Sequence, residues 1–72
     1  MSTSTDYVRD GDMFVATSDV EAASMDEARE IAKQQCRSDG YRVRSLRRAF
    51  RRPGRPGRWV VVHGVRLEVT AR

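Results

Sequence analysis

Small and apolar residues recur between positions 28 and 36 at the spacing of one face of an α-helix. The residues that share this face are Ala28, Ile31, Ala32, Gln35 and Cys36. Upstream, Ser24 and Glu27 have the S-x-x-E spacing of a capping box, in which both side chains bind free amides of the first helical turn. Gly40 favours the left-handed conformation that ends a helix. The pattern therefore predicts a helix that begins after Ser24 and ends before Gly40.

Apolar and polar residues alternate with a period of two on either side of this helix, which is typical of half-buried strands. The first alternating segment covers residues 13–22. The second begins at Tyr41 and changes parity near Ser45, which indicates a bulge or a twist of the strand. Two Pro-Gly pairs within residues 52–58 predict a chain reversal, after which a return strand begins at Trp59.

These elements predict an α+β fold with the order β-α-β-β, in which one helix packs on a three-stranded, antiparallel-type sheet. Residues 41–69 form a long hairpin in this arrangement. We expect residues 11–72 to make up a single domain and residues 1–10, which show no periodicity, to be a flexible leader. One helix covers only one side of a sheet, so we also expect an exposed sheet face and an exposed edge strand.

The stretch Tyr41-Arg42-Val43-Arg44-Ser45-Leu46-Arg47 is similar to the second strand of the dodecins, small flavin-storing proteins with one helix on a three-stranded sheet. The element order and the chain length resemble that family too, which implies the same fold. The resemblance does not extend to flavin binding, because the tryptophan that stacks flavin is missing. Its position is near Gly40, and the only tryptophan is Trp59. We therefore expect no cofactor.

A chain of 72 residues is long enough for one domain with a small core. Such a chain buries only about 60% of the surface that its unfolded form exposes, so its stability is marginal without further support. Cys36 is the only cysteine, which excludes an internal disulfide, and cysteine and histidine do not occur at the spacing of a metal site. We therefore expect the protein to form a homo-oligomer.

The sequence gives no indication of a membrane segment. No apolar run approaches the roughly 20 residues needed to cross a bilayer. The first residues lack the basic and apolar regions of a signal peptide. A single unpaired thiol also fits a reducing compartment. We expect a cytoplasmic protein that does not enter a membrane.

Charge is segregated along the chain. Residues 1–39 contain nine acidic and four basic residues, whereas residues 40–72 contain one acidic and ten basic residues. All but one of the basic residues are arginines, whose planar guanidinium group can form two hydrogen bonds to one phosphate or carboxylate. Eight of them are concentrated in the predicted hairpin: Arg42, Arg44, Arg47, Arg48, Arg51, Arg52, Arg55 and Arg58.

This density of arginine has three interpretations. The first is a nucleic-acid site, in which a two-stranded ribbon places guanidinium groups along the phosphates of DNA or RNA. The second is a contact with an acidic protein surface, including the acidic half of a neighbouring subunit. The third is a solvated face that keeps the protein soluble. No reader motif for base sequence is present, so we expect nucleic-acid binding to depend on the backbone.

Three aromatic residues, Tyr41, Phe50 and Trp59, lie among these arginines. Aromatic rings beside cations stack bases in proteins that bind single-stranded nucleic acid. Strand parity, however, places Trp59 and Phe50 on buried faces. We therefore predict that these rings contribute mainly to the core.

His63 and Cys36 are the residues whose side chains could act as a base or a nucleophile. His63 shares the predicted strand face of Trp59, and Cys36 lies on the helical stripe, so we interpret both as packing residues. The sequence contains no glycine-rich nucleotide-binding motif and no G-x-S-x-G motif. The acidic residues near the amino terminus lack the spacing of a calcium-binding loop. We predict that the protein is not an enzyme and binds no metal.

The leading hypothesis is a small non-enzymatic binding module that binds nucleic acid without sequence specificity through the arginine-rich hairpin. The alternative is an oligomeric structural or regulatory protein-interaction domain, such as a phage-like or accessory component. Its basic hairpin would dock on an acidic protein surface.

Overall fold

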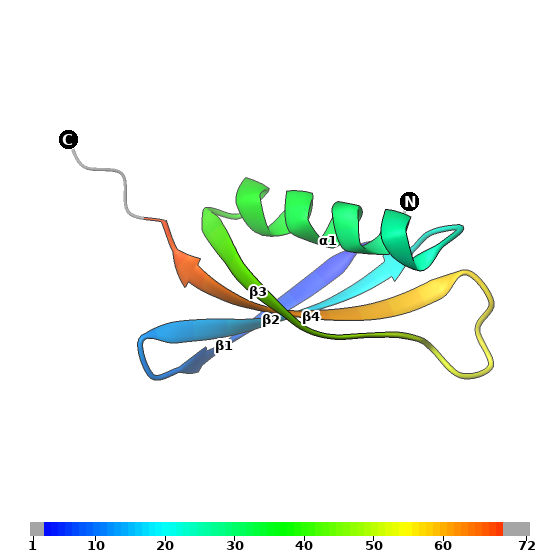
Figure 1. The fold of residues 1–72 in the computed structure, drawn as a ribbon, viewed down its shortest axis with the longest axis horizontal. Helices are drawn as coiled ribbons and strands as arrows, with labels where there is room; N and C mark the ends of the chain where they lie inside the picture. Colours follow the sequence, from blue (N-terminus) through cyan, green and yellow to red (C-terminus); the bar gives the residue numbers. More distant parts are fainter. Residues whose placement is uncertain (1–2, 69–72) are drawn as a thin grey trace.

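Residues 3–68 are described by a computed structural model, and they contain one helix and four strands. In chain order these are β1 (Ser4–Asp10), β2 (Met13–Glu21), α1 (Met25–Ser38), β3 (Tyr41–Arg51) and β4 (Arg58–Leu67). All strand pairs are antiparallel, and the order across the sheet is β1-β2-β4-β3. The helix packs on one side of the sheet, and within residues 3–68 no second layer covers the other side (Figure 1).

The predicted α+β class with one helix on an antiparallel sheet is confirmed, but the sheet has four strands instead of three. The additional strand, β1, comes from the segment that we expected to be a flexible leader, and it also departs from the three-stranded dodecin arrangement. The sequence of β1 shows no alternation of apolar and polar residues, because the side chains that face the helix are Thr5 and Tyr7, which both carry a hydroxyl group. The Thr5 hydroxyl lies 3.0 Å from that of Ser18, and the Tyr7 ring stacks on Tyr41 with 4.0 Å between centroids.

The helix α1 has the limits that the sequence predicts. Ser24 is its N-cap: the side-chain oxygen accepts a hydrogen bond from the backbone amide of Glu27 (3.2 Å). The Glu27 carboxylate in turn accepts one from the amide of Ala23 (2.7 Å). After the helix, Gly40 has a φ of 90°, which is the left-handed conformation that glycine adopts most easily. Local hydrogen bonds and backbone conformation therefore set both ends of α1.

The core lies between α1 and the two central strands of the sheet. Its buried apolar residues are Ala16, Val20, Ala28, Ala32, Cys36, Trp59, Val61 and Val65. The helix contributes small side chains such as Ala28 and Ala32, which leave room for the indole of Trp59 on the sheet. The indole N–H donates a hydrogen bond of 3.0 Å to the carbonyl of Ala22, which fixes the ring at the end of the core. The predicted helical stripe is thus the buried face of α1.

The predicted hairpin is present as β3 and β4, and its turn lies at one end of the molecule, beyond the helix (Figure 1). The strand β3 shifts register against β4 twice, between Val43 and Ser45 and between Leu46 and Arg48. The first shift lies at the parity change where the sequence indicates a bulge or a twist, whereas the second was not predicted. Val69, the predicted last residue of the hairpin, lies outside the described residues.

Substitution of Trp59 tests the packing of the helix on the sheet. Trp59→Ala removes the largest side chain of the core and is expected to lower the free energy of unfolding by about 3–5 kcal/mol. Trp59→Phe keeps most of the apolar volume but loses the hydrogen bond to Ala22, so its expected cost is smaller. Gln34→Ala, on the exposed side of α1, is the control. Urea unfolding measures the three effects, and a Trp59→Ala midpoint equal to that of Gln34→Ala would contradict the described core.

Candidate nucleic-acid interface

The side of the sheet that faces away from α1 contains complete rows of four residues, one from each strand. In the order β1, β2, β4, β3 these rows are Ser4-Asp19-Val60-Phe50, Asp6-Thr17-Val62-Arg48 and Val8-Val15-Gly64-Ser45. The intervening rows contain Ala16, Ser18, Val61 and His63, which are buried under the helix. We use the name open face for the side of the sheet that bears the three complete rows. It includes the neighbouring strand residues that point to the same side.

Two β-bulges increase the number of arginines on the open face. Each bulge places two consecutive residues of β3 opposite a single residue of β4. Arg44 and Ser45 lie opposite Gly64, and Arg47 and Arg48 lie opposite Val62. A Cβ atom at Gly64 would come within 3.3 Å of Arg47 Nε, which shows that the Arg47 side chain covers this glycine. The bulges therefore replace the usual alternation of a strand by a row of arginines on one side.

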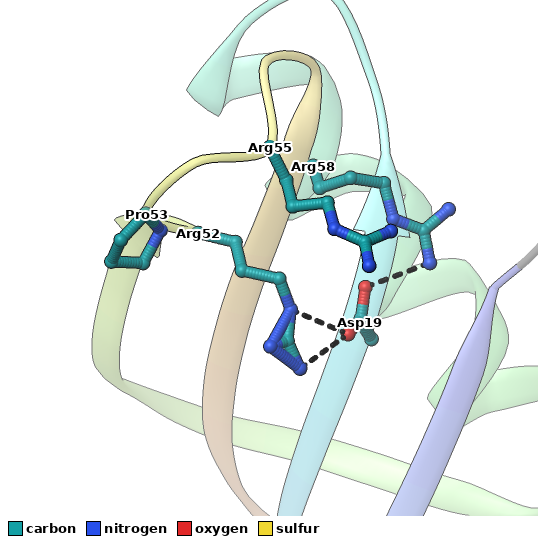
Figure 2. A pocket seen from close by; sticks show the side chains of 5 residues that line it. All are labelled: Asp19, Arg52, Pro53, Arg55 and Arg58. Atoms are coloured by element: carbon teal, nitrogen blue, oxygen red, sulfur yellow. Dashed lines mark hydrogen bonds and ion pairs between the residues drawn. The ribbon is translucent and has the colours of Figure 1, made fainter.

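The hairpin end of the open face holds three arginines around one carboxylate (Figure 2). The Asp19 carboxylate accepts hydrogen bonds from Arg52 Nε at 3.2 Å and from Arg58 Nη2 at 3.0 Å. Arg55 extends from the turn toward the same group, and with Pro53 these residues line a pocket of about 380 Å³. One carboxylate thus orders two guanidinium groups beside a third.

The other end of the open face has a second arginine cluster. Arg42 lies directly opposite Arg66 in the ladder, and like charges in such a pair repel each other. With Arg44, Glu68 and Leu67 they line a pocket of about 290 Å³. The Glu68 carboxylate is 3.7 Å from Arg42 Nε and balances part of this charge. Arg66 was not predicted as a site residue, because only the strand pairing places it beside Arg42.

The eight arginines predicted from the sequence have different surroundings. Those that contact carboxylates are Arg42, Arg47, Arg52 and Arg58. Arg48 and Arg51 lie over the rings of Phe50 and Trp59, at 5.0 and 5.5 Å from the centroids. Arg51 is opposite Trp59 in the ladder, so it belongs to the helix side. Arg44 and Arg55 are the two whose side chains form no ion pair, hydrogen bond or ring contact with residues 3–68.

The aromatic residues are divided between the two sides of the sheet. Trp59 is buried under the helix and Tyr41 stacks on Tyr7, so both contribute to the core as predicted. The prediction of a buried face for Phe50 is wrong: this ring is half-buried on the open face, opposite Val60. The second bulge is the reason, because it reverses the parity of β3 just before Phe50.

Two titratable side chains lie under the helix instead of on the open face. His63 is buried, and its Nδ1 atom has no hydrogen-bond partner within residues 3–68. Burial, helped by the positive charges of Lys33 and Arg29, lowers the pKa of His63 below 6.5. Cys36 is buried on α1, and burial raises the pKa of its thiol. Both positions agree with the packing interpretation, although a buried imidazole usually has a partner.

No protein-family model matches the chain, and no curated protein or solved structure matches it significantly. Within residues 3–68, histidine, cysteine, aspartate and glutamate form no group of three that could hold a metal ion. No helix in this part of the chain is long and apolar enough to cross a membrane. The function therefore has to be argued from the open face.

The buried His63 predicts that the protein loses stability in mild acid. The folded protein keeps this imidazole neutral to a lower pH than the unfolded chain, so the unfolded chain binds the proton first as the pH falls below about 6.5. The free energy of unfolding is therefore expected to decrease as the pH is lowered through this range. His63→Gln cannot titrate and should show a smaller decrease. Urea unfolding at a series of pH values measures the difference, and equal pH dependence in both proteins would reject this role of His63.

Proposed function

We propose that the protein is a small, non-enzymatic module that binds nucleic acid without sequence specificity through the arginines of the open face and of the hairpin turn. The observation that carries the proposal is the geometry of β3. Arg42, Arg44 and Arg48 lie on the open side of β3, and the second bulge adds Arg47 to the same side. All four residues are exposed and are not covered by α1, so a large anionic ligand can reach them.

Phosphate groups are suitable ligands for this row of guanidinium groups. Each guanidinium can form paired hydrogen bonds to phosphate oxygens, and each neutralised phosphate releases counterions. The eleven residues of β3 span roughly 36 Å in an extended conformation. One strand of B-form DNA carries about ten phosphates over that length. The strand thus has both the length and the charge to follow a nucleic-acid backbone.

Acidic residues on the opposite edge restrict where such a backbone can lie. Asp6 and Asp10 are exposed on β1, and their carboxylates would repel phosphates from that edge. The half-buried residues Val60 and Val62 on the central strand β4, with Phe50 beside them on β3, offer apolar contact to sugars or bases. Contacts of these kinds do not distinguish one base sequence from another, which supports binding without sequence specificity.

The alternative function uses the same face for a protein ligand. An oligomeric structural or regulatory interaction domain would dock its basic half on an acidic protein surface, and the exposed arginines of β3 suit such a partner. The two functions differ because only the first requires phosphate. A cytoplasmic location is part of both proposals, since it keeps the Cys36 thiol reduced.

Removal of accessible arginines is expected to weaken binding to duplex DNA, single-stranded DNA and RNA alike. The triple variant Arg44→Ala, Arg48→Ala and Arg55→Ala removes no ion pair formed within residues 3–68, so the fold should be retained. If all three side chains bind phosphate, the slope of log affinity against log salt should become shallower by about 2–3, because each contact contributes about 0.9. Fluorescence anisotropy at several salt concentrations measures this slope.

The matched control removes the same charge from the other side of the sheet, with Arg29→Ala, Lys33→Ala and Arg37→Ala on α1. This control should retain most of the salt dependence of the unmodified protein. An equal loss in both triple variants would show that net charge, and not the open face, determines binding. Absence of binding by the unmodified protein at low salt would reject the proposed function.

A further inference from the structure

The two halves of the open face carry opposite charges. The acidic residues of the β1–β2 half are Asp6, Asp10, Asp19 and Glu21. The basic residues of the other half, from β3, the turn and β4, are Arg42, Arg44, Arg47, Arg48, Arg52, Arg58 and Arg66. Val15, Val60 and Val62 lie on the central strands, and Val8 lies beside Val15 on β1. The strand order thus converts a segregation of charge along the sequence into a segregation across one surface.

We propose that two copies of the chain pack open face against open face, related by a two-fold axis that runs parallel to the strands between β2 and β4. Rotation about this axis exchanges the two edges of the sheet, so β1 of one copy lies over β3 of the second and β2 lies over β4. Sheets that pack face to face are about 10 Å apart, with strand directions within about 30°. The helices are then on the outside of the dimer.

The rows of the sheet show which charges this rotation brings together. Asp6 and Arg48 are at opposite ends of one row, so Asp6 of each copy lies over Arg48 of the second copy. Glu21 and Arg58 are paired between β2 and β4, so these residues also come to lie over each other. The two-fold axis generates each of these contacts twice. An acidic residue of one copy therefore lies over an arginine of the other at both of these positions.

Arginine side chains from β3 are long enough to make such contacts. Within one copy, Arg47 Nη1 already lies 3.8 Å from a carboxylate oxygen of Asp10, on the far edge of the same face. Both side chains are about half-exposed, so this ion pair is weak and can be exchanged for one with a second copy. The contact shows that the basic edge can bind the acidic edge when the two come within reach.

Apolar side chains of the open face favour association as well. Val8 is 64% exposed, which is the largest exposure among the large hydrophobic residues of the described chain. It shares a row with Val15, and the dimer would cover both side chains. A standard interface buries about 800 Å² on each partner. That area is about a sixth of the 5080 Å² surface of the protein, which one broad side of a four-stranded sheet can supply.

This dimer goes beyond the proposed function, because it depends on charge and apolar surface of the chain itself and not on a nucleic acid. The two uses of the face exclude each other, since both occupy Arg48 and its neighbours. Nucleic acid would therefore bind the monomer and shift the equilibrium away from the dimer by mass action. Self-association would then limit how much basic surface is free in the absence of nucleic acid.

Sedimentation velocity of the full chain without nucleic acid, over a wide range of protein concentration, tests the dimer. The 8.2 kDa monomer is expected to give way to a species of twice that mass as concentration rises. Asp6→Arg and Arg48→Glu should each raise the dimer dissociation constant by at least about tenfold, because like charges then meet at two places. The control variants Glu30→Arg and Arg37→Glu make the same charge changes on the exposed side of α1 and should leave the constant unchanged.

The decisive experiment combines the two charge reversals, which restores opposite charges at the contacts between the two copies. An equimolar mixture of the Asp6→Arg and Arg48→Glu variants should form a heterodimer, because one has arginine and the other has an acid at both positions. The double variant should dimerise with itself. A protein that is monomeric at every concentration, or single variants that dimerise normally, would overturn the proposal. A monomer that binds nucleic acid would leave the proposed function intact, whereas a dimer that binds none would reject that function alone.

Discussion

The packing of one short helix against a four-stranded sheet is the interaction on which the rest of the structure depends. The helix α1 supplies small buried side chains, and Trp59 with the valines of β2 and β4 fills the space between the two layers. No second helix exists within residues 3–68, so the other side of the sheet must be compatible with water or with a partner. Charged residues at its edges and half-buried valines at its centre meet this requirement. The surface suited to binding is therefore the side that the helix leaves uncovered.

The edge strand β3 shows how one local feature has two consequences. An unpaired strand edge is open to aggregation, and bulges and charged side chains are common ways to prevent it. In β3 the two bulges interrupt the edge, and the residues that they add, next to Ser45 and Arg48, are arginines. The same irregularities that protect the edge thus collect positive charge on the open face. At the hairpin end, Asp19 holds Arg52 and Arg58 in place and leaves Arg55 without a carboxylate partner among the described residues.

Sequence patterns predicted the elements with strong local signals and failed where the signal was non-local. The capping box at Ser24 and the glycine at position 40 define α1 without reference to the rest of the chain, and the Pro-Gly pairs define the hairpin. The strand β1 was missed because its inward side chains, Thr5 and Tyr7, are too polar to give an apolar alternation. The arginines of the site were found from their density. The sequence did not show that these arginines lie on one side of β3, because that depends on a second bulge near Arg48. It also did not show the division of charge across the face, which depends on the strand order.

The central claim is that the open face is the binding surface of this protein. Its most direct test is a titration of ¹⁵N-labelled protein with a single-stranded oligonucleotide at low salt, followed in two-dimensional amide and arginine side-chain spectra. Shift changes are predicted to concentrate in β3, β4 and the turn, including Arg44, Arg48 and Arg55, and to leave the outer side of α1 unaffected. Changes centred on α1, or spectra that do not change at all, would contradict the claim.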